Sequence, residues 1–551
     1  MKRLFALLLA VISVISLAGC TQPQQEEEKE QAKDMTGKYL LDEQRNEAII
    51  SDLGTARPVD GNCNVFYHIF VGSFSDSNGD GIGDLQGIIN RFDYINDGDP
   101  DSGVSLGVEG IWLSPIFLSP SYHKYDTTNY YTVDPQFGTQ EDLKELIDLC
   151  HSRGVKIILD LVINHTGYYH QWFTAFKEAH KNQDPTDPYY DFYTCSSQPL
   201  AGRTFHKIGG TNEYFEGNFS GSMPELNYDS DAVRQAMVDL AKYYLDLGVD
   251  GFRFDAAKYI YYGDEAQNAE FWKWYMAQLR AIKPDIYTVA EVWDGDGVTY
   301  PYFAATNCFN FSLAQVGGKY AEIAKGGNVN TLMRYVENYL TNIKAENPNA
   351  HMVSFLANHD TDRSAGYLQV ATGHAQMAAN LSILMPGSTF IYYGEEIGML
   401  GSRGGSTTDA NRRLAMLWGD EDTVKNPVGT DYKAKQANGT VADQLPNGDS
   451  LYNHYKKLIA IRLANPEIAY GAFIPLKTSG KAGGFLCSYE GSTVAVLHNP
   501  TKDAATLDLS KLTDVEFAYL AATVGLGSAT LEGTTLTIDA QTSVVLRQTK
   551  P

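Results

Sequence analysis

The chain has 551 residues, which is too long for one ordinary domain and short for four. Its formal net charge of −24 argues against a nucleic-acid partner, because such binders need a basic surface, and equally against an anionic substrate. A neutral ligand fits this charge best. The 12% aromatic content, with 35 Tyr, suits a site that offers flat apolar faces together with hydrogen bonds, as sugar rings require.

The N-terminus has the pattern of a bacterial targeting segment. Lys2 and Arg3 precede an apolar run over 4–17 that is short for a membrane span. Residues 17–20, Leu-Ala-Gly-Cys, resemble a lipoprotein processing box, which predicts a signal peptide over 1–19 and lipidation of Cys20. An ordinary signal peptide with a chance Cys is the alternative. Several acyl chains would anchor the protein at the extracellular face of a bacterial cell membrane.

Residues 20–60 are predicted to be a linker behind this anchor. The stretch to about Lys38 is rich in Gln, Glu and Lys and has almost no large apolar residue, so it cannot bury enough surface to fold alone. A modest amphipathic lead-in follows. No later stretch of the sequence is long and apolar enough to be a transmembrane helix.

Strand and helix patterns alternate from residue 64 onward. Short apolar runs, rich in β-branched and aromatic residues, occur at 64–71, 110–116, 156–164, 251–257, 287–293, 308–313, 352–360 and 389–397. Helical patterns separate them at 141–151, 231–247, 268–282, 329–343 and 373–384. The alternation predicts a parallel sheet buried on both faces, and eight runs predict a (β/α)8 TIM barrel. An open doubly wound sheet would need a Gly-rich phosphate loop after its first strand, which this sequence lacks.

Two segments depart from this alternation. Residues 166–227 are too long for a βα loop and predict a small domain inserted after the third strand. After the helical pattern at 451–463, short alternating strands follow at 484–489, 493–498, 505–509, 535–539 and 543–548. They predict an antiparallel β-sandwich over 468–551. The barrel would then comprise 61–165 and 228–467.

Five cysteines remain beyond Cys20. They are scattered, odd in number and without CxxC spacing, so the sequence predicts neither a disulfide framework nor a zinc site. One disulfide is left open without an assignment. The five are Cys63, Cys150, Cys195, Cys308 and Cys487.

Charged and polar side chains stand where several predicted strands end. In a barrel the C-terminal strand ends form the reactive face, so these groups are expected to converge on one mouth. Ionising several neighbouring carboxylates costs free energy because like charges repel, so at least one of them should have a raised pKa. A nucleophilic carboxylate beside a protonated acid is what a retaining glycosidase needs. The strand ends are Asp160 to His165, Arg253 to Asp255, Glu291 to Trp293, and Asn358 to Asp360.

These segments resemble the motifs of the α-amylase family of glycoside hydrolases, in the family's order. The match extends from about residue 64 to the C-terminus. The segments that resemble the four core motifs are 160–165, 251–255, Glu291 after its strand, and 358–360. Two further segments, 110–115 and 393–396, resemble flanking motifs.

The resemblance implies a role for each residue. Asp255 would be the nucleophile, Glu291 the acid and then the base, and Asp360 the group that binds ring hydroxyls and stabilises the transition state. Arg253 would orient Asp255. For each histidine the alternative is a structural residue at a strand end, whose hydrogen bonds are all made within the protein. The remaining substrate contacts would come from Tyr125, stacked under the ring, from Asp126, which supports the site, and from His123, His165 and His359.

A second cluster of oxygen-bearing side chains follows the first predicted strand. Hard oxygens at this density suit Ca²⁺. The loop resembles the one in the oligo-1,6-glucosidase-like branch of the family, where the carbonyl of Ile82 would join the side-chain ligands. An unmetallated Asx-turn loop is the alternative. The side chains are Asp76, Asn78, Asp80 and Asp84. A second calcium known from other members is doubtful here, because position 259 is Tyr instead of His.

Three further places bear on specificity. Residues 223–227, Met-Pro-Glu-Leu-Asn, resemble forms intermediate between the oligo-1,6-glucosidase and neopullulanase groups. Ala256 stands where relatives that cut α-1,6 bonds commonly have Val, so it favours α-1,4 bonds. Tyr122 stands where exo-acting relatives often have Asp, which favours endo cleavage in an open cleft.

Together these features predict a monomeric, lipid-anchored, retaining α-amylase that hydrolyses internal α-1,4 bonds of starch and maltodextrins. A 4-α-glucanotransferase or a maltodextrin-acting α-glucosidase could use the same residues. A non-catalytic starch-binding lipoprotein is the alternative from another class. All three carboxylates, Asp255, Glu291 and Asp360, are present, which argues against it.

Overall fold

The computed structural model describes residues 61–99, 102–404 and 408–548. The predicted signal peptide, Cys20 and the linker lie outside these residues. Within the described ranges, no helix has the length and apolar character to cross a membrane. The five cysteines of these ranges are free thiols.

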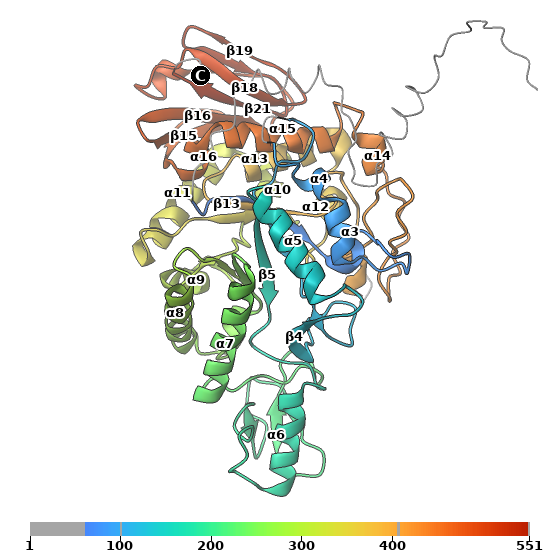
Figure 1. The fold of residues 1–551 in the computed structure, drawn as a ribbon. Helices are drawn as coiled ribbons and strands as arrows, with labels where there is room; N and C mark the ends of the chain where they lie inside the picture. Colours follow the sequence, from blue (N-terminus) through green and yellow to red (C-terminus); the bar gives the residue numbers. More distant parts are fainter. Residues whose placement is uncertain (1–60, 100–101, 405–407, 549–551) are drawn as a thin grey trace, which may run out of the picture.

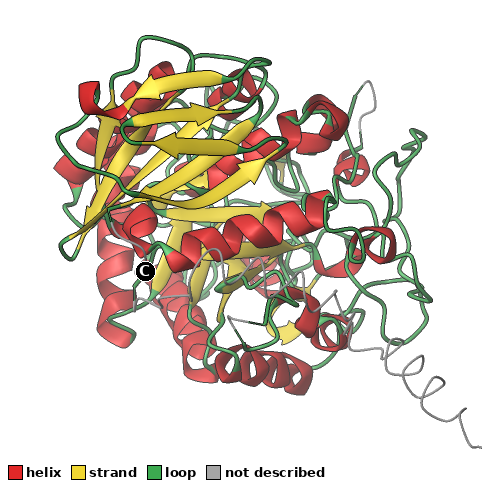
Figure 2. Ribbon diagram, turned by 90° about the horizontal axis from the view of Figure 1, so that it is seen from above, coloured by secondary structure: helices red, strands yellow, loops and turns green. Residues whose placement is uncertain are grey.

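Eight parallel strands form the central sheet (Figures 1 and 2). They follow one another around the sheet in chain order, with β13 paired to β1, and a parallel bridge between Phe309, just after β11, and Val353 of β12 closes the remaining gap. This closure makes the sheet a barrel, as predicted. The strands are β1 (Val65–Ile69), β2 (Gly110–Leu113), β5 (Lys156–Leu161), β9 (Gly251–Phe254), β10 (Tyr287–Ala290), β11 (Asn307–Cys308), β12 (Val353–Phe355) and β13 (Ser388–Tyr392).

Large side chains fill the inside of the barrel, so it is a packed core and not a pore. They include Phe66, Trp112 and Phe390, all buried, with Phe66 and Phe390 stacked 4.7 Å apart. The strands are buried on both faces, which explains why they are continuously apolar in sequence. Polar side chains on these strands therefore reach solvent only at the strand ends.

Helices surround the barrel and connect successive strands (Figure 1). Helices α5, α6, α7 and α11 are amphipathic, whereas α13 and α15 are buried on nearly all sides. Helix α5 begins at a capping box between Thr139 and Asp142. The α-helices are α3 (Leu85–Asn90), α4 (Phe92–Ile95), α5 (Gln140–Ser152), α6 (Gln171–Asn182), α7 (Asp231–Leu247), α8 (Glu265–Ile282), α9 (Asp296–Thr299), α10 (Lys319–Ala324), α11 (Val329–Glu346), α12 (Ser364–Tyr367), α13 (His374–Ile383), α14 (Val441–Gln444), α15 (Leu451–Ala464) and α16 (Pro466–Tyr470). The 3-10 helices are η1 (Val71–Ser73), η2 (Ala257–Tyr259), η3 (Tyr300–Ala304), η4 (Val370–Thr372), η5 (Asp409–Arg412) and η6 (Leu509–Lys511).

Two connections on the barrel carry strands of their own. A hairpin of β3 (Phe117–Leu118) and β4 (Asn129–Val133) lies between β2 and β5. Between β5 and α7, helix α6 packs with a three-stranded sheet at the lower end of Figure 1. That sheet comprises β6 (Cys195–Ser196), β7 (Phe205–Lys207) and β8 (Tyr214–Glu216).

The C-terminal region forms two antiparallel sheets, at the top of Figure 1. One has the order β14-β15-β16-β21-β18 and the other β17-β20-β19. Asn380 of α13 and Asn465 beyond α15 bind its strands through Ser543 and Arg547. The predicted fold class is confirmed. The strands are β14 (Ala472–Leu476), β15 (Gly483–Tyr489), β16 (Ser492–Asn499), β17 (Ala505–Asp508), β18 (Tyr519–Gly525), β19 (Ala529–Glu532), β20 (Thr535–Ile538) and β21 (Thr542–Arg547).

His498, on β16, gives the folded protein a pH-sensitive contribution to stability. Its ring is fully buried, Nδ1 contacts Ser543 Oγ at 2.7 Å, and Nε2 has no partner among the described residues. Burial lowers the pKa of His498 to about 3. The folded state thus keeps this histidine neutral, while the unfolded chain binds a proton near pH 6.5. Its contribution is therefore complete above that pH and is lost as the pH falls.

We therefore expect His498→Asn to flatten the pH dependence of unfolding. Between pH 7.5 and pH 5, the free energy of unfolding of the parent protein should fall about 2 kcal/mol further than that of the variant. Denaturant titrations at both pH values measure the difference. If the free energy of unfolding depends on pH in the same way in both proteins, His498 is not held neutral in the folded state.

Candidate active site

A buried arginine organises the carboxylates at the C-terminal end of the barrel. Arg253, on β9, donates from one terminal nitrogen to Asp160 Oδ1 and to Asp255 Oδ1, at 2.7 Å each. Its other terminal nitrogen contacts Glu291. The guanidinium is fully buried, so it fixes all three acidic groups and supplies the positive charge that their burial requires.

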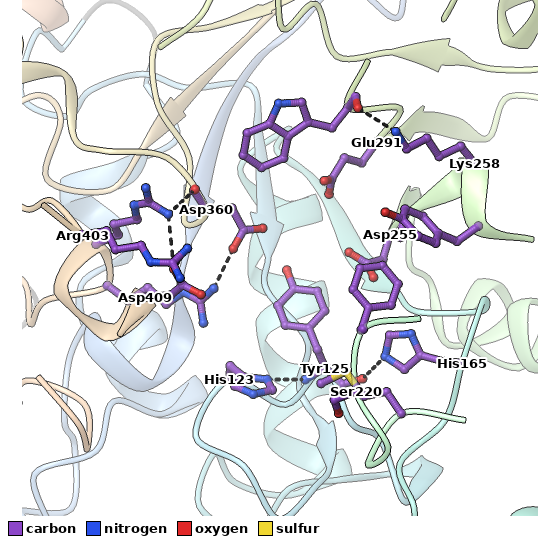
Figure 3. Close-up of a pocket in the computed structure, with 17 residues that line it drawn as sticks. His123, Tyr125, His165, Ser220, Asp255, Lys258, Glu291, Asp360, Arg403 and Asp409 are labelled. Atoms are coloured by element: carbon purple, nitrogen blue, oxygen red, sulfur yellow. Dashed lines mark hydrogen bonds and ion pairs between the residues drawn. The ribbon is translucent and has the colours of Figure 1, made fainter. Parts of the chain in front are cut away.

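A cavity of about 570 Å³ lies over this cluster (Figure 3). Figure 3 shows Asp255 and Glu291 pointing into it, with Asp360 on the opposite side and Tyr125 between them. The predicted residues that line the cavity are Asp255, Glu291, Asp360, Tyr125, His165 and His123. The barrel thus brings the three predicted catalytic carboxylates to one solvent-accessible space.

Three of the predicted site residues do not line this cavity. Arg253 lies below it. His359 is fully buried, and its Nε2 faces the Tyr125 hydroxyl at 2.6 Å and Asp360 Oδ2 at 3.0 Å. Asp126 accepts hydrogen bonds from the hydroxyls of Ser119 and Ser121. In this arrangement the three residues position others instead of reaching a ligand.

Asp360 is held as an anion on its side of the cavity. Arg413 donates to its Oδ1 at 2.7 Å, and His359 contacts its Oδ2. Burial alone would raise the pKa of Asp360, but His359 and Arg413 together keep it well below its usual range. A fixed negative charge at this place can stabilise a developing cation.

The pKa of Asp160 is shifted in the opposite direction to that of Asp360. Burial raises the pKa of this carboxyl, and the charge of Asp255 adds to the rise while Arg253 opposes it. The Tyr125 hydroxyl donates to Asp160 Oδ2 at 2.9 Å. A carboxyl with a raised pKa was expected at the strand ends. The structure places it beneath the cavity, where it links Tyr125 to Arg253.

The two histidines of the cavity wall are uncharged hydrogen-bonding groups. Burial lowers the pKa of His165, and it lowers the pKa of His123 to about 4. His165 Nε2 donates to the Tyr125 carbonyl at 3.2 Å, and the Tyr125 N–H donates to His123 Nδ1 at 3.1 Å. Both rings therefore also fix the loop that carries Tyr125.

Several lining residues were not predicted from the sequence. Arg413 follows η5, far from Asp360 in the chain, and no periodic pattern marks it. Trp293 is 41% exposed and stacks on Phe311 at 4.9 Å, while Phe219 is 45% exposed and packs on Tyr259 at 4.5 Å. Exposed aromatic faces beside a cavity are a signal for sugar rings. Further lining residues without a predicted role are Ser220, Lys258, Arg403, Asp409 and Arg412. Met223, Ala256 and Tyr259, which the sequence had connected with specificity or a second calcium site, also line the cavity.

The backbone turns sharply just after Asp255. Ala256 has φ 43° and ψ 45°, the left-handed conformation that costs a non-glycine residue about 1 kcal/mol. The next N–H, of Ala257, donates to the Glu291 carbonyl at 2.9 Å. This turn ends β9 and ties the segments of Asp255 and Glu291 together.

The predicted calcium loop follows β1 and is held by its own hydrogen bonds. Asp76 accepts from the N–H groups of Asn78, Gly79 and Gly81, and Asp84 caps α3. Burial raises the pKa of Asp84, and the charge of Asp76 adds to the rise. The donors are all hard oxygens, which suits Ca²⁺. Within the described ranges, however, the loop carboxylates do not gather within 4.8 Å of one another.

Comparison with known proteins yields a family match over most of the chain. Residues 68–471 match the family model described as "Alpha amylase, catalytic domain". "Alpha-amylase 3" of Dictyoglomus thermophilum is 34% identical over 442 residues, covering 79% of this chain and 84% of that protein. A "4-alpha-glucanotransferase" of Thermotoga maritima is 32% identical over 351 residues, covering 61% and 72%.

Solved structures of similar sequence also match most of the chain. "Eubacterium rectale Amy13B" superposes with a TM-score of 0.85 at 33% identity, covering 93% of this chain and 99% of that one. An "alpha-amylase from H.orenii" superposes with a TM-score of 0.77 at 33% identity, covering 88% and 99%.

Proposed function

The chain belongs to the α-amylase family of glycoside hydrolases, and we propose that it hydrolyses internal α-1,4-glucosidic bonds of starch and maltodextrins with retention of configuration. The observation that carries the proposal is the contact of Asp255 and Glu291 with the same guanidinium, that of Arg253. Two carboxylates on one guanidinium stand close together. This favours the separation of about 5 Å in retaining glycosidases over the 6.5–9.5 Å or so of inverting ones.

The proposed reaction gives each carboxylate one task. Asp255, which accepts a hydrogen bond from Arg253, attacks the anomeric carbon and forms a covalent glycosyl-enzyme. Glu291 protonates the departing glycosidic oxygen and then takes a proton from the attacking water. Asp360, anionic across the cavity, stabilises the positive charge on the sugar ring in both steps.

Two features support α-1,4 bonds and endo cleavage. Ala256 lines the cavity with a small side chain beside Asp255. Tyr122, at the place where exo-acting relatives often have Asp, accepts a hydrogen bond from Arg413 at 3.1 Å through its neutral hydroxyl. The absence of a carboxylate at this place favours endo cleavage.

The test is a time course of products from maltoheptaose, soluble starch and pullulan. We expect mixed shorter maltooligosaccharides from the first two, a rapid fall in starch iodine staining, and little cleavage at the α-1,6 bonds of pullulan. Release of glucose alone, with iodine staining preserved, would replace the endo proposal with an exo-acting α-glucosidase.

A 4-α-glucanotransferase is the second candidate. The exposed faces of Trp293 and Phe219 favour it, because they can hold an acceptor sugar next to the glycosyl-enzyme. It would use the same three carboxylates. Early products longer than maltoheptaose, formed without new reducing ends, would support transfer over hydrolysis.

We also propose that the loop over 76–84 binds Ca²⁺ through Asp76, Asn78, Asp80, Asp84 and the Ile82 carbonyl. The ion would neutralise the carboxylates of the loop by drawing them together and stabilise the loop, and no catalytic step depends on it. At a Ca²⁺ concentration a hundredfold above Kd, the stabilisation would be about 2.7 kcal/mol.

We expect removal of calcium with a chelator to lower Tm, and added Ca²⁺ to restore it. Asp80 is exposed, so Asp80→Ala should fold normally and lose this response. Scanning calorimetry of both proteins, with and without Ca²⁺, is the measurement. Equal Tm values for the parent protein in chelator and in excess Ca²⁺ would contradict the site.

The cellular location is proposed from the N-terminal pattern. A lipidated Cys20 would hold the enzyme at the extracellular face of the cell membrane, where long starch chains are accessible. Cys20→Ser should move the activity from the membrane fraction to the soluble fraction. Activity that stays with the membrane in this variant would contradict lipid anchoring.

A further inference from the structure

Three metal-ligating side chains meet in the inserted domain, away from the catalytic cavity. His180 lies in the last turn of α6, Cys195 begins β6, and Glu213 directly precedes β8. Their ligand atoms all lie within 4.8 Å of one another. None of the three lines the catalytic cavity.

Hydrogen bonds fix the tautomer of His180. Its Nε2 lies 3.0 Å from the Tyr190 carbonyl, and because a carbonyl can only accept, Nε2 carries the hydrogen. In a neutral ring, Nδ1 then presents a lone pair. A metal-binding histidine typically donates its other N–H to such a carbonyl, which orients the ring and makes the free nitrogen more basic.

The lone pair of Nδ1 faces two further electron donors. Glu213 Oε2 is 2.7 Å from Nδ1, and Cys195 Sγ is 3.9 Å from it. A lone pair and a carboxylate at this distance need a cation between them, either a proton or a metal ion. Zinc bonds of about 2.0–2.3 Å place tetrahedral ligand atoms about 3.3–3.8 Å apart, so small shifts suffice for a metal.

Aromatic packing holds the cluster in place. The His180 ring stacks on Tyr190 at 4.1 Å and an interplanar angle of 14°, and Phe176 lies 4.3 Å away. The His180 side chain is 3% exposed, whereas that of Glu213 is 35% exposed, so an ion could enter from the Glu213 side. Imidazole, thiolate and carboxylate together are a donor set that suits zinc.

We propose that His180 Nδ1, Cys195 Sγ and Glu213 Oε2 form a zinc site, with water as the fourth ligand. The ion ties α6 to two segments of the small sheet and stabilises the inserted domain. Burial, with the nearby charge of Glu213, raises the pKa of the Cys195 thiol to about 12. The thiol is therefore protonated without metal, and forming the Zn–S bond releases this proton to solvent.

Cobalt(II) titration of the purified full chain tests the site, because thiolate-bound cobalt absorbs in the near ultraviolet. Excess Ca²⁺ is present throughout, so that the calcium loop does not compete for the probe. We expect one Co²⁺ per chain, a thiolate-to-cobalt band that Zn²⁺ abolishes, and a rise in Tm with Zn²⁺. Cys195→Ser should lose the band, and Glu213→Gln should weaken Co²⁺ binding at least tenfold.

His206→Gln is the matched control, because it removes another histidine of the inserted domain and leaves the three ligands intact. It should bind Co²⁺ as the parent protein does. Starch hydrolysis and circular dichroism confirm that each variant is folded. A parent protein without the thiolate band, or variants that bind Co²⁺ like the parent, would show that only a proton joins His180 to Glu213 and would overturn the proposal.

Discussion

Asp255→Asn is expected to lower kcat for starch by about 10⁴-fold or more, because the amide cannot form the glycosyl-enzyme. The change is nearly isosteric, and the amide oxygen can still accept the hydrogen bond that Arg253 donates to Asp255. The cavity should therefore keep its shape, and calorimetry should detect maltoheptaose binding with similar affinity. Reducing-sugar release from soluble starch is the measurement.

Asp294→Asn makes the same chemical change at a carboxylate that does not line the cavity. Asp294 is 41% exposed on its side chain and pairs with Lys258 at 3.0 Å. Its activity should stay within a few-fold of the parent. Full activity in Asp255→Asn would overturn the nucleophile assignment. If the parent protein itself binds starch but does not cleave it, the protein is a non-catalytic starch-binding protein.

Glu291→Gln is the second change with a large expected effect. Loss of the general acid should lower starch hydrolysis by about 10²–10⁴-fold. A maltosyl fluoride with the α configuration has a leaving group that needs no proton. The variant should therefore release a burst of about one fluoride per enzyme, and then slow down because no base activates water.

Azide distinguishes this role from a merely structural one. As a nucleophile it needs no general base, so it should restore steady turnover of the fluoride substrate in Glu291→Gln and give a glycosyl azide. The parent enzyme should show little change with azide. A variant that loses activity equally on starch and on the fluoride, without a burst, would contradict the acid–base assignment.

The sequence predicted those parts of the fold that rest on local periodicity. Eight apolar runs gave the barrel, and helix α7 (Asp231–Leu247) has the predicted bounds because its amphipathic pattern ends at Gly248. In the C-terminal sheets, strands β14, β18 and β19 were missed. β14 contains a proline, Pro475, and lies at the edge of its sheet. β18 carries small residues and pairs with β21 across the β19–β20 hairpin, while β19 has only four residues and pairs with β20 directly.

The site was predictable where it follows a strand. Asp255 and Glu291 come directly after β9 and β10, so barrel geometry alone brings them together. Arg413 was not predictable, because its contact with Asp360 arises from a loop beyond β13. The left-handed Ala256 and the His180–Cys195–Glu213 cluster depend on tertiary packing that no local spacing encodes.

The anomeric configuration of newly released sugar tests the central claim most directly. Proton NMR spectra, recorded within the first minutes of maltoheptaose cleavage, separate α from β reducing ends before mutarotation mixes them. Action of Asp255 as a nucleophile predicts that α ends form first and β ends appear only with mutarotation. Initial release of β ends would mean that water attacks the sugar directly, and it would contradict the covalent mechanism built on Asp255, Glu291 and Arg253.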